Sequence, residues 1–330
     1  MRRGIGIYCA GLTLLLLWLA AGMLQRVIEK RPLVPHDVVV NIEKGDSLDT
    51  IALRLTEERI PLRTVWFKYY VFRLGLARRL KAGEYEIKRN MTAADIARLL
   101  ASGKTRQYAI TFPEGWSYRQ LLQLMRENPN LLHTLDANNP GQVLAELASD
   151  KPLPEGLFFP DTYFFEKNTA DIALLKRAYA KMRLVLDAEW RNRDPDTPLT
   201  DAYQALILAS IIEKETAIPD ERAKIAGVFS RRLRKKMLLQ TDPTVIYGMG
   251  DAYAGNISSE DLRTPTPYNT YLQPGLPPTP IAMPGQASIA AALHPEPGAA
   301  LYFVARGDGG HMFANTLAEH EKYVNQFQKQ

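Results

Sequence analysis

The segment 205–219, ALILASIIEKETAIP, restricts the fold most, because it is almost wholly apolar and yet carries two glutamates. A stretch this apolar is expected in a protein core, where carboxylates are rarely buried without a partner or a function. Helical rotation of about 100° per residue places Glu215 one turn beyond Ile211 and Ile212, on an apolar side. The same rotation turns Glu213 away from that side. Aliphatic surroundings raise the pKa of a carboxyl group, as a general acid requires near neutral pH.

The composition is that of a folded protein with room for two domains. The chain has 330 residues, of which 46% are hydrophobic and 23% are charged, as in ordinary globular proteins. Its single cysteine, Cys9, excludes an internal disulfide, and its five histidines show none of the close spacings of zinc sites. We therefore expect no metal site and no other cofactor. The net charge of +5 is too diffuse to indicate nucleic-acid binding, although it suits work beside anionic lipid or an anionic wall polymer.

The amino terminus contains an apolar stretch as long as a membrane-spanning helix. Residues 4–24 carry no charge, and basic residues flank them on both sides. About twenty apolar residues form one transmembrane helix, whereas a cleaved signal peptide, the alternative, has a shorter apolar region. We therefore expect a cytoplasmic tip and a single-pass transmembrane anchor within residues 1–31. The bulk of the chain is then expected outside the cytoplasm.

Residues 32–107 have the pattern of a small α+β module. A β-branched strand that begins at Val38 leads into a turn, where Asp46 or Ser47 can cap a following helix. The strand–GDSL–helix opening resembles LysM-type glycan-binding domains, and a structural spacer is the alternative. The further elements expected here are a helix at 65–76, a strand within 82–92, and a helix at 93–100 capped by Thr92.

Residues 108–330 are expected to form a larger mixed α/β domain with long ordered loops, so that the whole chain has an α+β fold. The basic run 231–236 is expected to be a solvated helix face. Proline and glycine at high density exclude long helices from three polar segments, and their tyrosine, asparagine and threonine residues favour ordered loops over disorder. Such loops around a buried acidic helix describe a polysaccharide-binding active site. The three segments are 238–250, 264–285 and 301–320.

Five unusual motifs in one order resemble the MltG/YceG family of membrane-anchored endolytic murein transglycosylases: ASIIEKETA, LQTDPTVIYG, TPYNTY, GLPPTPIAMPG and YFVARGDGGHMF. The resemblance covers nearly the whole chain. It implies cleavage of MurNAc-β-1,4-GlcNAc bonds in nascent peptidoglycan strands, which leaves 1,6-anhydro-MurNAc ends and terminates strand elongation. It also implies a single-pass protein of the bacterial inner membrane with its catalytic part in the periplasm, beside penicillin-binding proteins and other cell-wall synthesis proteins.

The resemblance implies that Glu215, the glutamate followed by Thr216, is the catalytic acid, with Glu213 as its rival. A lone acid suffices, because the muramyl C6 hydroxyl of the substrate is the nucleophile, whereas ordinary glycosidases need two carboxylates. Several of the remaining candidates could instead be structural: Asp242 within its own turn, Glu155 and Tyr163 in the aromatic core, and His311 as a structural histidine. The residues expected to bind the sugars are Gln240, Thr241, Asp242, Tyr247, Tyr268, Asn269, Thr270, Glu155, Tyr163 and His311.

Two readings from other classes of protein remain open. The chain could be a non-catalytic peptidoglycan-binding scaffold of the cell-wall synthesis machinery, in which case no anhydro-ended products would form. It could also be a Ser–Lys hydrolase, because Ser210 and Lys214 lie one helical turn apart. The usual GxSxG and SxxK arrangements of such hydrolases are missing from the sequence.

Overall fold

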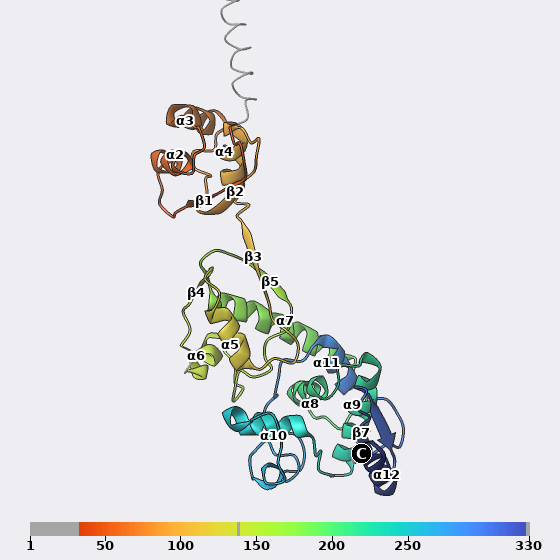
Figure 1. Ribbon diagram of the computed structural model, residues 1–330. Helices are drawn as coiled ribbons and strands as arrows, with labels where there is room; N and C mark the ends of the chain where they lie inside the picture. The colour runs from red at the N-terminus through yellow and green to blue at the C-terminus, as the bar shows by residue number, and fades with distance from the viewer. Residues whose placement is uncertain (1–32, 137–138, 328–330) are drawn as a thin grey trace, which may run out of the picture. The chain divides into compact units, whose positions relative to one another are not determined.

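The computed structural model describes residues 33–136 and 139–327, and contacts divide the chain into two compact units (Figure 1). The first unit extends to Tyr108 and the second begins at Ala109. Both units combine helices with short strands, and every sheet among the described residues has two strands. The fold is therefore of the mixed α+β type.

The first unit pairs two strands and packs three helices on them. Alternate residues of β1 are buried, and the strand pairs with β2 in an antiparallel register that sets Val40 opposite Tyr85. The Ser47 hydroxyl caps the first helix by accepting a hydrogen bond from the backbone N–H of Thr50 at 3.1 Å. Thr92 and Asp95 cap the third helix reciprocally. The elements are β1 (Val38–Ile42), α2 (Leu48–Glu57), α3 (Thr64–Arg73), β2 (Gly83–Ile87) and α4 (Ala93–Ser102).

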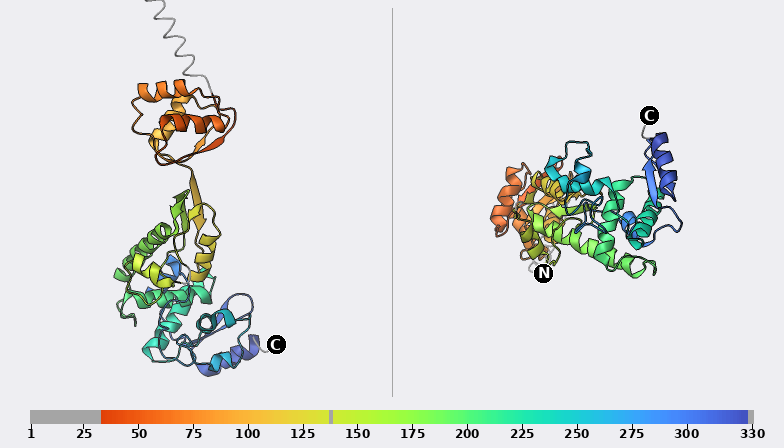
Figure 2. Two further views of the ribbon diagram at one scale, coloured as in Figure 1. Left: turned by 90° about the vertical axis from the view of Figure 1, so that its left-hand side faces the viewer. Right: turned by 90° about the horizontal axis from the view of Figure 1, so that it is seen from below.

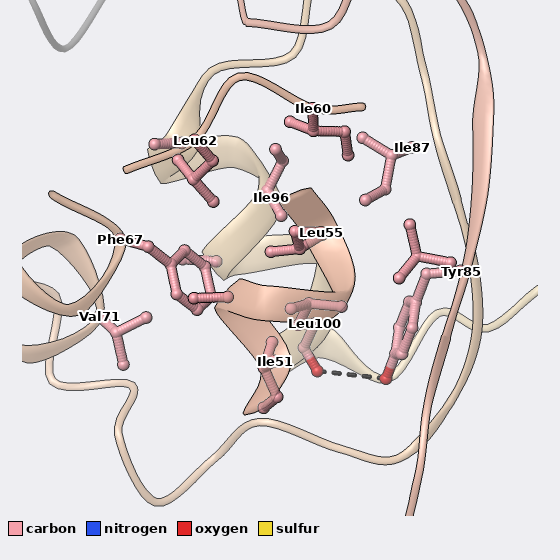
Figure 3. Packing of buried hydrophobic residues seen from close by; sticks show 14 of the residues in the cluster. Ile51, Leu55, Ile60, Leu62, Phe67, Val71, Tyr85, Ile87, Ile96 and Leu100 are labelled. Carbon is pink, nitrogen blue, oxygen red and sulfur yellow. Dashed lines mark hydrogen bonds between the residues drawn. The ribbon is translucent and has the colours of Figure 1, made fainter. Parts of the chain in front are cut away.

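The three helices and both strands of this unit enclose a hydrophobic core of their own (Figure 3). Leu55 from α2, Phe67 from α3 and Leu100 from α4 are completely buried in it. The Tyr85 ring enters from β2, and its hydroxyl donates to the carbonyl oxygens of Lys81 at 2.8 Å and Leu100 at 3.3 Å. With a hydrophobic core of its own, the unit has the organisation of a separate domain.

The expected fold class is corrected in one respect, the single membrane-spanning helix at the amino terminus. None of the helices in residues 33–136 and 139–327 combines the length and the apolar character that crossing a bilayer requires. The longest of them, α7 (Asp171–Arg191), carries charged residues along its 21 positions. The stretch 4–24, on which the expectation rested, lies outside the described residues.

The second unit is mainly helical. Its three small sheets pair β3 with β5, β4 with β6, and β7 with β8. The β4–β6 pair is parallel and the β7–β8 pair is antiparallel. Besides α7, the elements are β3 (Gln107–Thr111), α5 (Tyr118–Arg126), β4 (Leu131–Leu132), α6 (Pro140–Glu146), β5 (Thr162–Glu166), β6 (Thr169–Ala170), α8 (Ala202–Glu215), α9 (Pro219–Arg234), α10 (Asp242–Met249), η1 (Gly250–Ala252), η2 (Asp261–Arg263), α11 (Gln286–Leu293), β7 (Tyr302–Ala305), β8 (His311–Ala314) and α12 (Leu317–Phe327).

The apolar helix α8 lies at the centre of this unit, as its composition predicted. Every residue from Ala205 to Ile212 is buried, and the helix packs against α7, α9 and α11 (Figure 1). A helix that is apolar on all sides needs such surroundings. At its amino end, the Asp201 carboxylate caps the helix by accepting from the N–H of Gln204 at 2.9 Å.

A proline turn ends α8 directly after Glu215. Pro219 occupies the first turn of α9, where its missing N–H costs nothing, and it restricts the preceding Ile218 to an extended conformation. The Thr216 hydroxyl accepts from the N–H of Ile218 at 3.0 Å and closes the turn. The chain therefore leaves the core at Glu215, and the carboxyl group lies at the carboxyl end of a buried helix.

Part of the segment 301–320, expected to be irregular, is a β-hairpin. Phe303 faces Phe313 across the β7–β8 pair. The turn uses Gly307 and Gly309, whose φ angles of 86° and 88° lie in the left-handed region that favours glycine. Helix α12 packs along this hairpin (Figure 2), although none of its residues is fully buried.

Candidate active site

A cavity of about 480 Å³ lies among the carboxyl end of α8, helices α9 and α10, the β7–β8 hairpin and α12. Five residues singled out from the sequence line it together. They come from three of the five quoted motifs, which are far apart in the chain. These residues are Glu215, Gln240, Thr241, Asp242 and His311.

Glu215 is half-buried in the wall of this cavity. Its carboxyl Oε1 accepts a hydrogen bond from the Thr241 hydroxyl. Burial raises the pKa of Glu215 to about 7, the nearby charge of Asp242 raises it too, and the Thr241 bond and His311 oppose the rise. The negative end of the helix dipole also disfavours a carboxylate at this position. A carboxyl group with a pKa near neutrality can both donate a proton and take one back.

Thr241 is held in position by Thr270, which lies behind it and outside the cavity lining. The Thr270 carbonyl oxygen accepts from the N–H of Gln240 at 3.1 Å, and its hydroxyl oxygen accepts from the N–H of Thr241, also at 3.1 Å. Gln240 has a φ of 51°, a left-handed conformation that is uncommon outside glycine. Such conformations persist where neighbouring contacts enforce them, so the Thr270 bonds fix the turn that presents Thr241 to Glu215.

Asp242 opens α10 and points its carboxylate at Tyr271. Its Oδ1 accepts a hydrogen bond from the Tyr271 hydroxyl at 2.6 Å. Burial raises the pKa of Tyr271, and the bond to Asp242 raises it further, so the phenol keeps its proton. The Asp242 carboxylate thus bonds to a residue 29 positions away rather than to the backbone of its own turn. Tyr271 also lines the cavity, and its place in the TPYNTY motif was the signal that could have identified it.

His311 meets a second carboxylate, Glu221, which the sequence did not single out. The His311 Nδ1 lies 2.7 Å from Glu221 Oε2, and its backbone N–H donates to Glu221 Oε1 at 2.9 Å. Glu221 stands in the first turn of α9, where an acidic residue is common because it faces the positive end of the helix dipole. Nothing in the local pattern connects it with a histidine 90 positions later.

Arg232 shows that the expected solvated face at 231–236 is wrong at this position. Its side chain is buried, and its guanidinium donates to the carbonyl oxygens of Leu301 at 2.7 Å and Leu239 at 2.8 Å. It also lies over the Tyr302 ring at 5.1 Å, against which His320 stacks at 5.3 Å. All three side chains line the cavity. The spacing Ile225, Val228, Phe229, Arg232 puts Arg232 on the apolar face of α9 and was the available signal.

Glu155, Tyr247 and Tyr268 form a separate cluster that does not line the Glu215 cavity. Glu155 is buried, and its two oxygens accept from the N–H of Tyr118 at 2.9 Å and the hydroxyl of Tyr247 at 3.1 Å. Burial raises the pKa of Glu155 to about 7 against these bonds. The rings of Tyr247 and Tyr268 pack edge to face with centroids 4.8 Å apart.

Tyr163 and Asn269 are parts of the scaffold rather than of the cavity wall. The Tyr163 hydroxyl donates to the carbonyl oxygen of Phe159 at 2.7 Å, and its ring packs against Phe112 with centroids 4.8 Å apart. Asn269 is fully buried, and its amide donates to three carbonyl oxygens in and directly after η2, those of Asp261, Leu262 and Thr264. The TPYNTY motif therefore contributes to the scaffold through Asn269 and Thr270 and to the cavity wall through Tyr271.

Glu213, the rival acid, lies away from the cavity lining. Its Oε2 accepts from the N–H of Gly285 at 3.0 Å, and its Oε1 lies 4.0 Å from the Arg222 guanidinium. These contacts tie α8 to α9 and to the start of α11. The separation of the two glutamates agrees with their helical phase.

The Ser–Lys arrangement is contradicted by the positions of both residues. Ser210 is fully buried, donates to the carbonyl oxygen of Ile207 at 2.7 Å and accepts from the N–H of Ile281 at 3.0 Å. The Lys214 ammonium points elsewhere, to the carbonyl oxygen of Gly115 at 3.2 Å. A nucleophile must reach its substrate and its base, and this serine reaches neither. Within residues 33–136 and 139–327, no group of three or more histidine, cysteine or acidic side chains is arranged to hold a metal ion.

Comparison with known proteins identifies one matching family model and several similar proteins. A family model described as the YceG-like family matches residues 40–326. The endolytic murein transglycosylase of Bacillus subtilis (strain 168) is 33% identical over 311 residues, which cover 87% of this chain and 85% of that protein. The protein of the same name from Streptococcus pneumoniae (strain D39) is 27% identical, and the match covers 87% of this chain but only 58% of that longer protein. The crystal structure of a yceG-like protein from Listeria monocytogenes superposes with a TM-score of 0.55 at 28% identity and covers 87% of this chain and 98% of its own.

Proposed function

The chain belongs to the YceG-like family, and we propose that it is an endolytic murein transglycosylase in which Glu215 is the general acid. It cleaves MurNAc-β-1,4-GlcNAc bonds inside peptidoglycan strands and leaves 1,6-anhydro-MurNAc ends. The observation that carries the proposal is the Glu215 carboxyl group in the cavity wall, whose pKa burial raises to about 7. At neutral pH a large fraction of such a group holds the proton that a leaving sugar needs.

The reaction uses one proton twice. Glu215 gives its proton to the glycosidic oxygen while the bond between that oxygen and C1 of the muramyl residue breaks. The C6 hydroxyl of the same residue then attacks C1, and its proton passes to the Glu215 carboxylate. The acid is thereby regenerated, the new bond closes the anhydro ring, and no water is consumed. The hydrogen bond from Thr241 supports this cycle, because it stabilises the carboxylate between the two transfers.

We assign to Asp242 the stabilisation of the positive charge that develops at C1. Its carboxylate lines the same cavity as Glu215 and is oriented by the Tyr271 hydroxyl at 2.6 Å. Groups that are already oriented toward developing charge stabilise a transition state without reorganisation. The protonated phenol of Tyr271 keeps the Asp242 carboxylate fixed during the reaction.

The pair Glu215 and Asp242 also favours one competing activity, glycoside hydrolysis. Two carboxylates in one cavity can serve as acid and as nucleophile or base for water. The products distinguish the two reactions: hydrolysis adds water and leaves reducing ends, whereas the transglycosylase leaves anhydro ends. A non-catalytic scaffold would leave the strands uncut.

Mass spectrometry of murein sacculi treated with the purified chain tests the proposal. The wild type is expected to release anhydro-ended muropeptides, and Glu215→Gln is expected to release none. Glu213→Gln is the matched control on the same helix, because the amide can still accept from the N–H of Gly285. Reducing ends in place of anhydro ends would replace the proposed reaction by hydrolysis. Intact strands with the wild type would favour the scaffold.

We further propose that cleavage takes place in the periplasm, at the inner membrane, on strands that penicillin-binding proteins are extending, so that it ends strand elongation. The first unit is proposed to be a LysM-like glycan-binding module. Its order of strand, two helices and strand, with an antiparallel β1–β2 pair, supports this assignment. Because the unit has its own hydrophobic core, it can be tested alone. We expect it to sediment with purified sacculi, and its recovery in the supernatant would contradict the assignment.

A further inference from the structure

The Glu221–His311 pair is a second buried acid–base contact at the Glu215 cavity, and the reaction described above does not use it. Both side chains are about nine-tenths buried, with 11% and 10% of their surface exposed. Glu221 holds the histidine at two points, the ring Nδ1 at 2.7 Å and the backbone N–H at 2.9 Å. Two bonds to one carboxylate fix both the strand β8 and the rotation of the ring.

The protonation of this pair follows from its contacts. Burial raises the pKa of Glu221, but the bonds from the ring and the backbone N–H of His311 outweigh burial and leave the pKa below its usual range. Glu221 is therefore a carboxylate, which can only accept hydrogen bonds. The proton of the 2.7 Å contact must then reside on Nδ1 of His311. The other ring nitrogen, Nε2, bonds to nothing within the described residues, and His311 lines the cavity.

Several charged and titratable groups surround Glu215 and His311, and each contributes to the local field. The charge of His311 favours the ionised form of Glu215, and that of Asp242 disfavours it. Arg306 adds a positive charge beside Glu221. The remaining groups are Arg232 from α9, Tyr271, Tyr302 from β7 and His320 from α12, which line the same cavity.

We propose that Glu221 is a positioning residue of the transglycosylase reaction: it locks the proton of His311 on Nδ1, directs Nε2 into the cavity and holds the ring where its charge acts on the Glu215 carboxyl group. The inference rests on the proposed function, since it concerns the proton that Glu215 transfers. When Glu215 gives up that proton, it becomes a carboxylate, which the charge of His311 stabilises. No bond to His311 forms or breaks, and the ring proton stays on Nδ1.

The direction in which the pH–rate profile moves in a Glu221 variant distinguishes this positioning role from a simple effect of the negative charge of Glu221. Glu215 must be protonated to act as an acid, so activity falls as the pH rises through its pKa. Loss of a cation near Glu215 raises that pKa and moves the alkaline limb of the pH–rate profile upward. Loss of a bare negative charge at Glu221 would lower the pKa and move the limb downward. Glu221→Gln therefore gives opposite shifts under the two explanations.

The experiment measures the release of anhydro-ended products from sacculi between about pH 5 and pH 9. For Glu221→Gln and His311→Gln we expect the alkaline limb to move upward by about one pH unit, the size of effect that a nearby opposite charge exerts. The rate at the optimum is expected to fall roughly tenfold, the equivalent of one pKa unit. Asp308→Asn is the matched control, because it removes a carboxylate from the exposed hairpin turn without touching the ring. Its profile is expected to stay unchanged.

Nitrogen-15 shifts of the histidine rings provide a readout that does not depend on activity. In the wild type, Nδ1 rather than Nε2 of His311 is expected to carry the ring proton, and Glu221→Gln is expected to abolish that preference. An unprotonated Nδ1 in the wild type, or an alkaline limb that stays or moves downward in Glu221→Gln, would overturn the inference. If the wild type makes no anhydro ends, the proposed function fails, and the nitrogen shifts still decide the state of the pair. Should Glu221→Gln fail to fold, the nitrogen shifts of the wild type still decide whether Glu221 holds the proton on Nδ1.

Discussion

Replacing Glu215 by glutamine should make the protein more stable while abolishing its activity. The carboxyl group is half-buried, and burial raises its pKa from 4.5 to about 7. Between these values the native state holds a proton that the unfolded chain has released, so stability falls as the pH rises through this window. Glutamine carries no charge and keeps an oxygen that can accept from the Thr241 hydroxyl. The variant therefore avoids the cost of ionising a buried group.

The magnitude follows from the size of the shift. A rise from 4.5 to about 7 corresponds to at most about 3 kcal/mol, at 1.36 kcal/mol per unit, once the pH exceeds 7. The carboxyl group is partly open to the cavity, and solvent screening reduces this figure. We expect Glu215→Gln to raise the free energy of unfolding by about 1–2 kcal/mol at about pH 8 and by much less at about pH 5.

The assay compares thermal unfolding of the wild type and the variant at the two pH values. For a unit of this size, each kcal/mol moves the midpoint by about 2–4 °C. Glu213→Gln is the control on the same helix, because it removes a carboxylate that contacts the N–H of Gly285 and the Arg222 guanidinium and does not line the cavity. A gain for Glu215→Gln that is equal at both pH values, or absent at the higher one, would refute the reasoning.

Three further changes have defined outcomes. Thr241→Val keeps the shape of the side chain but removes the hydrogen bond to the Glu215 carboxylate. The pKa of Glu215 should therefore rise, and the rate at the pH optimum should fall roughly tenfold. A pH–rate profile measures both changes. Tyr271→Phe frees the Asp242 carboxylate and should lower kcat with little loss of stability; an unchanged kcat would remove Asp242 from the mechanism. Leu208→Ala leaves a cavity in the centre of α8 and should lower the free energy of unfolding by about 2–5 kcal/mol in urea denaturation.

The sequence was sufficient to predict the features that depend on local pattern. The apolar run of α8 indicated a buried central helix, and its phase separated Glu215, at the cavity, from Glu213, which contacts Gly285 and Arg222. The helix caps at Ser47 and Thr92 were also predictable, because capping depends on residues three apart. Each of these signals lies within one or two helical turns.

The features that were missed depend on contacts between distant parts of the chain. Glu221 looks like an ordinary acidic residue at the start of a helix until β8 brings His311 to it. Arg232 sits in a run of basic residues, and only the packing of β7 against α9 shows that it is buried. Conversely, Asn269 belongs to a recognisable motif and yet serves the loop scaffold. A motif identifies a neighbourhood, and tertiary packing decides which of its side chains reaches the cavity.

Helix α12 gives the carboxyl end of the chain an influence on the site. Leu317, His320 and Val324 contribute to the cavity wall, although the helix buries none of its residues completely. A segment held by so little buried surface opens easily. A purification tag or fluorescent protein fused after α12 is therefore expected to displace the helix and change the wall of the cavity. Kinetic measurements are best made with the tag at the other end. If a carboxyl-terminal fusion changes the length of the glycan products, then the α12 side of the cavity helps to set that length.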